Sequence, residues 1–372
     1  MENQIFELQY AMDTFYFLIC GALVMWMAAG FSMLEAGLVR TKNTTEILTK
    51  NVGLFAIACT MYLVCGYQFM YDGGYFLSGV TTVAQMDDAA VAQVLSDSAA
   101  EGFDGGSVYS GASDFFFQVV FVATAMSIVS GAVAERMKLW AFLAFAVVMT
   151  GFIYPIEGGW TWGGKDVPGL GALSYSDYAG SGIVHLAGAA AALAGVIILG
   201  PRKGKYSAAG TVNAIPGANL PLATLGVFIL WMGWFGFNGG SQLAMGSFDD
   251  STAVATIFIN TNLAACAGVM ACAVVSRLVT GKTDVIMMLN GALGGLVAIT
   301  AEPLAPSPFL AIVIGAIGGI IVFFGTGLLL RLKIDDVVGA IPVHGFAGIF
   351  GTLVVPVSNS AANFGTQLYG IL

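Results

Sequence analysis

The sequence predicts an all-α protein that crosses a membrane many times. Of its 372 residues, 58% are hydrophobic and only 9% are charged, whereas soluble proteins average about 25% charged residues. The mean hydropathy is +0.85. The apolar residues form continuous runs of about 20, which is the length of a membrane-spanning helix. An outer-membrane barrel would instead alternate apolar and polar residues.

Ten runs are candidate spans. They are residues 14–34, 51–71, 115–134, 139–156, 180–200, 220–243, 252–275, 285–301, 309–330 and 337–357. The chain also contains 50 glycines, and small residues allow helices in a membrane to pack closely. We therefore expect a polytopic bundle of ten tightly packed transmembrane helices.

The charges exclude other classes and set an orientation. With 13 basic and 22 acidic residues, the net charge is −9, so nucleic acid is not an expected partner. Basic residues fall in every second loop, and only Lys165 lies in the other set. The positive-inside rule makes the basic loops cytoplasmic and places the N-terminus on the outer side. The expected membrane is the cell membrane, that is, the inner or plasma membrane. The basic residues are Arg40, Lys42, Lys50, Arg136, Lys138, Arg202, Lys203, Lys205, Arg277, Lys282, Arg331 and Lys333.

The two histidines occupy matching positions. His185 and His344 each lie eight residues after an aspartate, Asp177 and Asp336. At about 1.5 Å per residue, each histidine is about 12 Å deeper than its aspartate. That depth is close to the middle of a hydrocarbon core about 30 Å thick.

The ten spans divide into two halves of five. Because five is odd, a second copy of the same unit inserts upside down. We expect an inverted repeat of residues 1–200, which include a long outer loop at 72–114, and residues 201–372. Inverted repeats are typical of transporters, whose working site lies where the halves meet, here around a central pore.

Histidines within a membrane are energetically costly and usually functional. Burial disfavours the charged imidazole, so both rings are expected to be neutral. Each neutral ring has one donor and one acceptor nitrogen, so two facing rings can share a hydrogen bond and still handle a proton. Neither histidine has the nearby cysteines or paired carboxylates of a metal site. We expect that the protein is not an enzyme and that it binds no metal or cofactor.

Several motifs follow one another along the chain. They are Glu35-Ala-Gly-Leu-Val-Arg40, Gly131-Ala-Val-Ala-Glu-Arg136, Trp160-Thr-Trp-Gly-Gly164, Asp177-Tyr-Ala-Gly-Ser-Gly-Ile-Val-His185, Gly233-Trp-Phe-Gly-Phe-Asn238 and Val343-His-Gly-Phe-Ala-Gly348. In this order they resemble the ammonium transporter family, the Amt/Mep/Rh superfamily, and its bacterial Amt branch. Twin histidines are the hallmark of that family.

The resemblance implies an eleven-span homotrimer in the lipid bilayer with one pore per subunit. It implies ammonium as substrate and methylammonium as its analogue. The implied residues are Trp162, Ser241, Phe121 and Asp177 for recruitment, Phe121 and Phe237 for a pore gate, and His185 and His344 for the proton relay. For Asp177 it implies a structural and electrostatic role rather than direct contact.

A neutral pore would separate ammonium from potassium by chemistry, because the two ions are similar in size. Charge is costly at the membrane midplane, and only ammonium can lose its charge by giving up a proton. We expect ammonia to cross past the phenylalanines. The proton either passes separately along the histidine pair or returns outward.

The sequence leaves one functional alternative open. It ends at Leu372, before the eleventh helix and cytoplasmic tail that the resemblance implies. Either the chain is partial, or it continues into a fused signalling domain, as in family members that act as ammonium sensors. A transporter, with a PII-type regulator as a possible partner, is the leading interpretation, and a sensor is the alternative.

Overall fold

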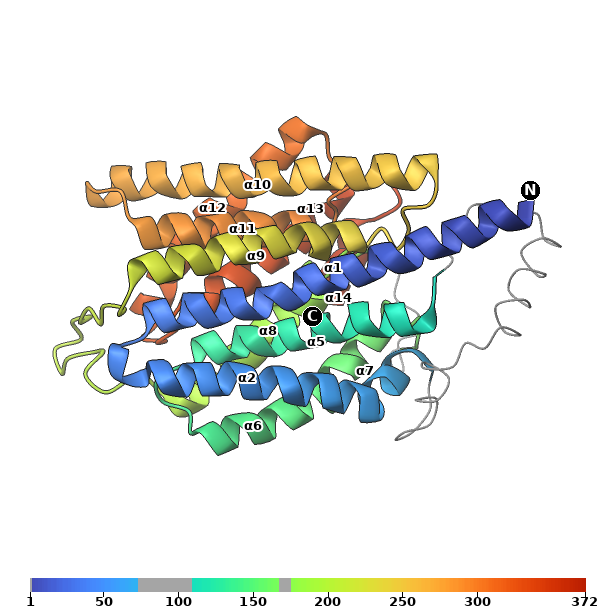
Figure 1. The fold of residues 1–372 in the computed structure, drawn as a ribbon. Coiled ribbons are helices and arrows are strands. Elements are labelled where there is room, and N and C mark those ends of the chain that lie inside the picture. Colours follow the sequence, from blue (N-terminus) through green and yellow to red (C-terminus); the bar gives the residue numbers. More distant parts are fainter. Residues whose placement is uncertain (1, 73–108, 167–174) are drawn as a thin grey trace.

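The computed structural model describes residues 2–72, 109–166 and 175–372. Most of the predicted loop 72–114 therefore lies outside the described residues. Within these residues the chain is helical, and the β-structure found there is a single bridge between Tyr206 and Val212. The helices lie side by side, and their connections gather at two opposite ends (Figure 1).

All α-helices except the last, α14, follow the predicted spans. In chain order they are α1 (Glu2–Leu38), α2 (Thr44–Met61), α5 (Gly111–Ala132), α6 (Leu139–Val148), α7 (Tyr154–Gly159), α8 (Ala187–Leu199), α9 (Leu220–Gly240), α10 (Phe248–Thr280), α11 (Val285–Thr300), α12 (Pro308–Arg331), α13 (Ala347–Ser358) and α14 (Phe364–Ile371). Short helical turns of other pitch join or extend them. These are η1 (Thr41–Asn43), η2 (Tyr62–Gly66), η3 (Gln68–Asp72), η4 (Met149–Ile153), η5 (Ser181–Leu186) and η6 (Ile341–Phe346).

The described part of the chain has nine helices that are long and apolar enough to cross a membrane. The remaining predicted span, 285–301, forms α11, which is apolar but has only 16 residues. At 1.5 Å per residue it is about 24 Å long, less than a hydrocarbon core of about 30 Å. The polytopic helical class is confirmed, but helix length alone does not establish a count of ten.

One basic residue is not where the loop pattern puts it. The sequence assigns Lys50 to the loop after the first span, but α2 begins at Thr44 and includes it. Its side chain is only 1% exposed. A lysine beside an apolar run is interpreted as the end of the span, because the sequence does not show that its charge is paired with Glu35 inside the bundle. The loops with Arg40, Arg136 and Arg202 do gather at one end of the bundle, called the basic end below (left in Figure 1).

Glycines bring the helices into backbone contact, as their number predicts. A Cβ on Gly268 of α10 would lie 2.1 Å from the carbonyl oxygen of Gly291 in α11. Likewise, a Cβ on Gly226 of α9 would lie 2.7 Å from the carbonyl oxygen of Gly30 in α1. Such contacts tolerate no side chain, so the glycines set how closely these helices approach.

The short helix α14 returns to the bundle interior. Gln367 is fully buried, and its amide nitrogen donates to the carbonyl oxygens of Ser176 (2.7 Å) and Thr352 (2.9 Å). Its amide oxygen accepts from the Ser176 N–H at 2.8 Å. These bonds hold the segment that leads into Asp177.

Candidate functional site

Each histidine lies on a short turn that an aspartate caps. Before η5, Gly180 has φ +109°, and before η6, Gly339 has φ +83°. Glycine adopts these left-handed angles without strain. Each glycine lies three residues after its aspartate, Asp177 or Asp336, and five before its histidine.

The Asp177 carboxylate accepts four backbone hydrogen bonds. Oδ1 accepts from Gly180 (3.0 Å) and Ser181 (2.9 Å), and Oδ2 accepts from Gly182 (2.8 Å) and Ile183 (2.9 Å). Asp336 does the same at η6 with Gly339 (3.1 Å) and Ile341 (2.7 Å). Both aspartates therefore satisfy the free N–H groups at a helix start. They fix the turns that carry the histidines.

His185 and His344 are in direct contact. Their Nδ1 atoms are 3.1 Å apart, and their ring centroids are 5.0 Å apart at an interplanar angle of 24°. His185 is fully buried, and His344 is 4% exposed. The Nε2 atom of His185 has no hydrogen-bond partner among the described residues. A buried nitrogen of this kind is available to a small polar guest.

Aromatic rings hold His185 in place. Its ring stacks on Trp234 with centroids 5.0 Å apart, and on Phe237 with centroids 5.3 Å apart. Trp234 is itself fixed, because its Nε1 donates to the Thr300 hydroxyl at 2.8 Å. Trp234 and Phe237, which also contact each other at 5.7 Å, thus restrain the imidazole from α9.

The two predicted gate phenylalanines stack on each other. The Phe121 and Phe237 ring centroids are 4.1 Å apart at an angle of 30°, and both rings are buried. On its other side, Phe121 meets Trp162 edge to face at 6.2 Å. Trp162, Phe121, Phe237, His185 and His344 therefore form an unbroken row of ring contacts.

A cavity of about 300 Å³ lies at the Trp162 end of this row. Trp162, Ser241 and Phe121, for which the resemblance implies a recruitment role, line it, while Asp177 is not among its lining residues. Instead, the Asp177 carbonyl oxygen accepts from Trp162 Nε1 at 2.9 Å. The Ser241 hydroxyl donates to the Phe237 carbonyl oxygen at 2.9 Å, which leaves its oxygen lone pairs directed elsewhere.

The sequence does not predict the polar wall of this cavity. Asp114 accepts from the Tyr67 hydroxyl at 2.6 Å and from the Gln118 amide at 3.2 Å. Burial, and then the charge of Asp114, raise the pKa of Tyr109 to about 12, so this phenol stays neutral. The wall is thus acidic and rich in tyrosine: Tyr67, Tyr71, Tyr109, Asp114, Gln118 and Tyr178.

A second, smaller cavity of about 20 Å³ lies at the other end of the row. His344 lines it together with Glu35, Ser127 and Asn290. A water-sized guest needs about 10–15 Å³, so one small molecule fits. The histidine pair therefore lies between a large acidic cavity and a small one.

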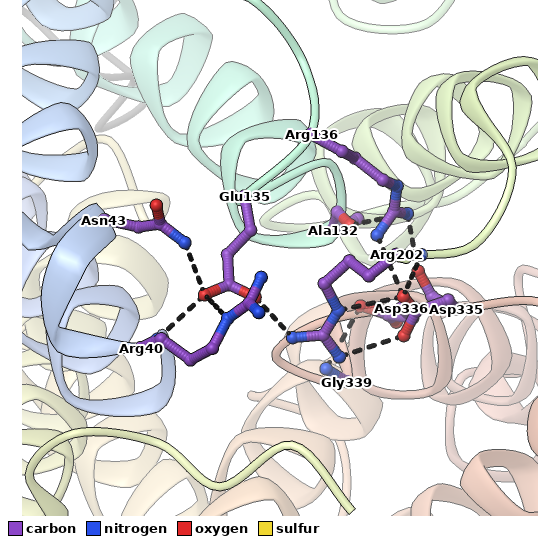
Figure 2. Close-up of polar contacts among 9 residues, drawn as sticks. All are labelled: Arg40, Asn43, Ala132, Glu135, Arg136, Arg202, Asp335, Asp336 and Gly339. Carbon is purple, nitrogen blue, oxygen red and sulfur yellow. Dashed lines mark hydrogen bonds and ion pairs between the residues drawn. The ribbon is translucent and has the colours of Figure 1, made fainter. Parts of the chain in front are cut away.

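The basic end is closed by a buried network of charges (Figure 2). The Arg202 guanidinium bonds both oxygens of Asp335 (2.8 and 3.0 Å) and also Glu135 (2.8 Å). Burial alone would raise the pKa of Glu135, but hydrogen bonds from Arg40, Arg202 and Asn43 lower it to about 2. Because Asp335 precedes Asp336, the network anchors the turn that carries His344.

Comparisons with known sequences point to one family. A sequence profile of the Ammonium Transporter Family matches residues 15–370. Ammonium transporter Amt2 of Archaeoglobus fulgidus is 42% identical over 362 residues, which cover 92% of this chain and 70% of that protein. A putative ammonium transporter of Synechocystis is 40% identical over 381 residues, 100% of this chain and 81% of that protein.

Solved structures have the same fold. A structure named Sensor Amt Protein superposes with a TM-score of 0.85 at 32% identity and covers 100% of this chain and 90% of that one. Candida albicans Mep2 superposes with a TM-score of 0.80 at 23% identity, covering 99% and 81%. At that lower identity the similarity to Mep2 concerns the fold alone.

Proposed function

This chain belongs to the ammonium transporter family, and from that premise we propose that it recruits ammonium at the Trp162 cavity and conducts ammonia through the twin-histidine row. It is an integral membrane protein with apolar spanning helices. Members of its family are transporters, not enzymes. The observation that supports the proposal most is the unbroken row from Trp162 through Phe121 and Phe237 to the two histidines.

Recruitment relies on weak attraction of a cation. The acidic wall around Asp114 favours a positive guest, and the ring of Trp162 adds a cation–π attraction of about 0.5–2 kcal/mol. Ser241 Oγ can accept one N–H of the guest. Ammonium, unlike potassium, has N–H groups that match such acceptors, and methylammonium shares this property.

Selection relies on the closed phenylalanine stack. Phe121 and Phe237 leave no polar partner for a hydrated ion, and charge within a membrane is costly. Ammonium passes this point by releasing a proton, and ammonia then crosses. The unpartnered Nε2 of His185 accepts either the proton or the guest, and the 3.1 Å contact with His344 provides the next transfer.

The charge pattern supports an orientation in the membrane. The basic end would face the cytoplasm under the positive-inside rule, which places the N-terminus outside the cell membrane. The matching Asp177 and Asp336 caps support two inverted halves, 1–200 and 201–372. A homotrimer with one pore per subunit, regulated by a PII-type protein, completes the proposal.

A second function deserves a direct test because a specific observation favours it. The chain is 32% identical to the structure named Sensor Amt Protein over its whole length. In a sensor, the same cavity would bind ammonium and report to a fused or partner domain, with little or no transport.

Electrical recording from proteoliposomes distinguishes the two functions. A transporter gives an ammonium-evoked current or methylammonium uptake above that of protein-free liposomes. A sensor gives ammonium-dependent thermal stabilisation with neither current nor uptake. Trp140 provides the control, because its ring is 80% exposed on α6 and Trp140→Leu should leave both readouts unchanged.

A further inference from the structure

Glu35 is a buried carboxylate that the pore mechanism above does not use. It lies on α1 with only 1% exposure. Oε2 accepts from the Ser130 hydroxyl at 2.8 Å. Oε1 has no partner of good hydrogen-bond geometry among the described residues, and the Asn51 side chain of α2 also favours the charged carboxylate. A buried carboxylate oxygen without a good partner is energetically expensive, and it is available to a guest or a proton.

The carboxylate faces the path that leaves the histidine pair. Glu35 and His344 line the same cavity of about 20 Å³ at the basic end of the ring row. One water or ammonia molecule fits in this cavity, which both side chains line. We propose that Glu35 is the site where a proton leaving His344 is taken up and returned to ammonia. This inference rests on the proposed transport function.

Lys50 complements Glu35. Its ammonium lies 3.8 Å from Glu35 Oε2 and donates to the Ser130 carbonyl oxygen at 2.8 Å. Ser130 therefore bonds both members of the pair, one through its hydroxyl and one through its backbone. Lys50 also lies over the Phe142 ring, 4.9 Å from its centroid. The positive charge of Lys50 favours the ionised form of Glu35, which is the form that accepts a proton. The same charge limits how tightly Glu35 then holds that proton.

The proton step balances without another reactant. The Glu35 carboxylate accepts one proton delivered through His344 and becomes a carboxylic acid, while the imidazole returns to its neutral form. Ammonia in the small cavity then takes that proton through its lone pair. It leaves toward the basic end as ammonium, and Glu35 is again a carboxylate.

Other charges lie around the pair. Glu46 on α2 and Arg136 after α5 interact electrostatically with it. Both lie toward the basic end, where a proton or cation leaves the bundle. Their opposite charges keep the surroundings nearly neutral. Glu35, paired with Lys50, is therefore the carboxylate next to the cavity that takes up and releases the proton.

The test requires a variant that folds. Glu35→Gln alone leaves Lys50 buried and unpaired, so the informative protein is Glu35→Gln with Lys50→Met, because methionine keeps the contact with Phe142. Glu35→Asp retains a carboxylate and serves as the rescue. Glu157→Gln is the matched control, since Glu157 also has an unpartnered oxygen but lines a different cavity between α6 and α8.

The proteins are reconstituted in liposomes, and the charge moved by an ammonium pulse is measured together with lumenal pH. Monodispersity by size exclusion is required of each. We expect the double variant to lose about 100-fold in charge, the lower range for a positioned acid or base. Its lumen should become alkaline, because ammonia that enters without its proton takes one there. Glu35→Asp should recover charge transfer, and Glu157→Gln should match the wild type.

Each other outcome overturns a defined claim. Wild-type charge transfer with an unchanged double variant rejects Glu35 and leaves transport intact. Wild-type ammonia flux without charge also rejects Glu35 but supports a gas channel. Wild-type protein with neither flux nor charge rejects the transport function itself, and the Glu35 inference with it.

Discussion

His185 and His344 hydrogen-bond through like atoms, Nδ1 to Nδ1, at 3.1 Å. Only one of these nitrogens can carry the shared proton, so in the neutral pair the two rings are different tautomers. One ring has its Nε2 free to accept, and the other has an Nε2–H to donate. A proton that passes through the contact exchanges the two tautomers. The original tautomers must therefore be restored before the pair can transfer another proton in the same direction.

Trp162 should determine the apparent affinity for methylammonium more than the maximal rate of its uptake. Trp162→Leu removes the aromatic face and the hydrogen bond to the Asp177 carbonyl oxygen. A lost cation–π attraction of about 0.5–2 kcal/mol raises the half-saturating methylammonium concentration about 2- to 30-fold. Uptake kinetics in proteoliposomes measure it. An unchanged half-saturating concentration, with Trp140→Leu as reference, would mean that recruitment occurs elsewhere.

The phenylalanine stack should exclude potassium. Phe121→Ala removes a buried ring that lies 4.1 Å from Phe237 and opens the barrier between the large cavity and the histidines. We expect measurable potassium efflux from loaded liposomes and a stability loss of about 3–5 kcal/mol. The control is Phe324→Ala, because Phe324 is 56% exposed on α12. Continued exclusion of potassium by Phe121→Ala would contradict a gate at this position.

Arg202 should be essential for stability at the basic end. Its guanidinium pairs with Glu135 and Asp335, whose side chains are fully buried. Arg202→Met leaves Glu135 with Arg40 and Asp335 with Arg136 as their remaining cations. The lost charged hydrogen bonds should still cost about 1.5–3 kcal/mol, seen as a lower melting temperature in detergent. Arg202→Lys should lose less, because it keeps the charge but not the planar fork. Lys203→Met, at an exposed neighbouring position, should change little.

The same network predicts acid sensitivity. The pKa of Glu135 falls from 4.5 to about 2 on folding, because hydrogen bonds from Arg40 and Arg202 outweigh its burial. A lowered folded pKa adds stability that is complete above pH 4.5 and is lost as the pH falls toward 2. Melting temperatures measured from pH 7 to 3 should therefore drop below about pH 4.5. In Glu135→Gln the drop should be smaller, and an equal drop would assign it to other groups.

The sequence predicts the helices well because hydropathy and charge are properties of whole segments. The polytopic class and the location of the apolar runs depend on many residues at once, so single exceptions such as Lys50 do not disturb them. The same averaging conceals those exceptions. Lys50 is placed in a loop by its charge, whereas its partner Glu35 is 50 − 35 = 15 positions away and meets it only after α1 and α2 pack.

The site likewise contains residues that the sequence predicts and residues that only the folded structure brings together. Matched spacing points to His185 and His344 without any structure, because each histidine lies on the same local turn after an aspartate. The acidic cavity wall could not be predicted, since Tyr67, Asp114 and Tyr178 come from separate segments and meet only in the folded bundle. The stack of Trp234 on His185 is likewise a consequence of helix packing.

We propose above all that the histidine pair carries the proton that ammonium releases. Ammonium-evoked current in proteoliposomes, recorded for the wild type and for His185→Leu with His344→Leu, tests it most directly. We expect a clear wild-type current and none in the double variant, with monodispersity retained. An undiminished, ammonium-selective current in the double variant would contradict it.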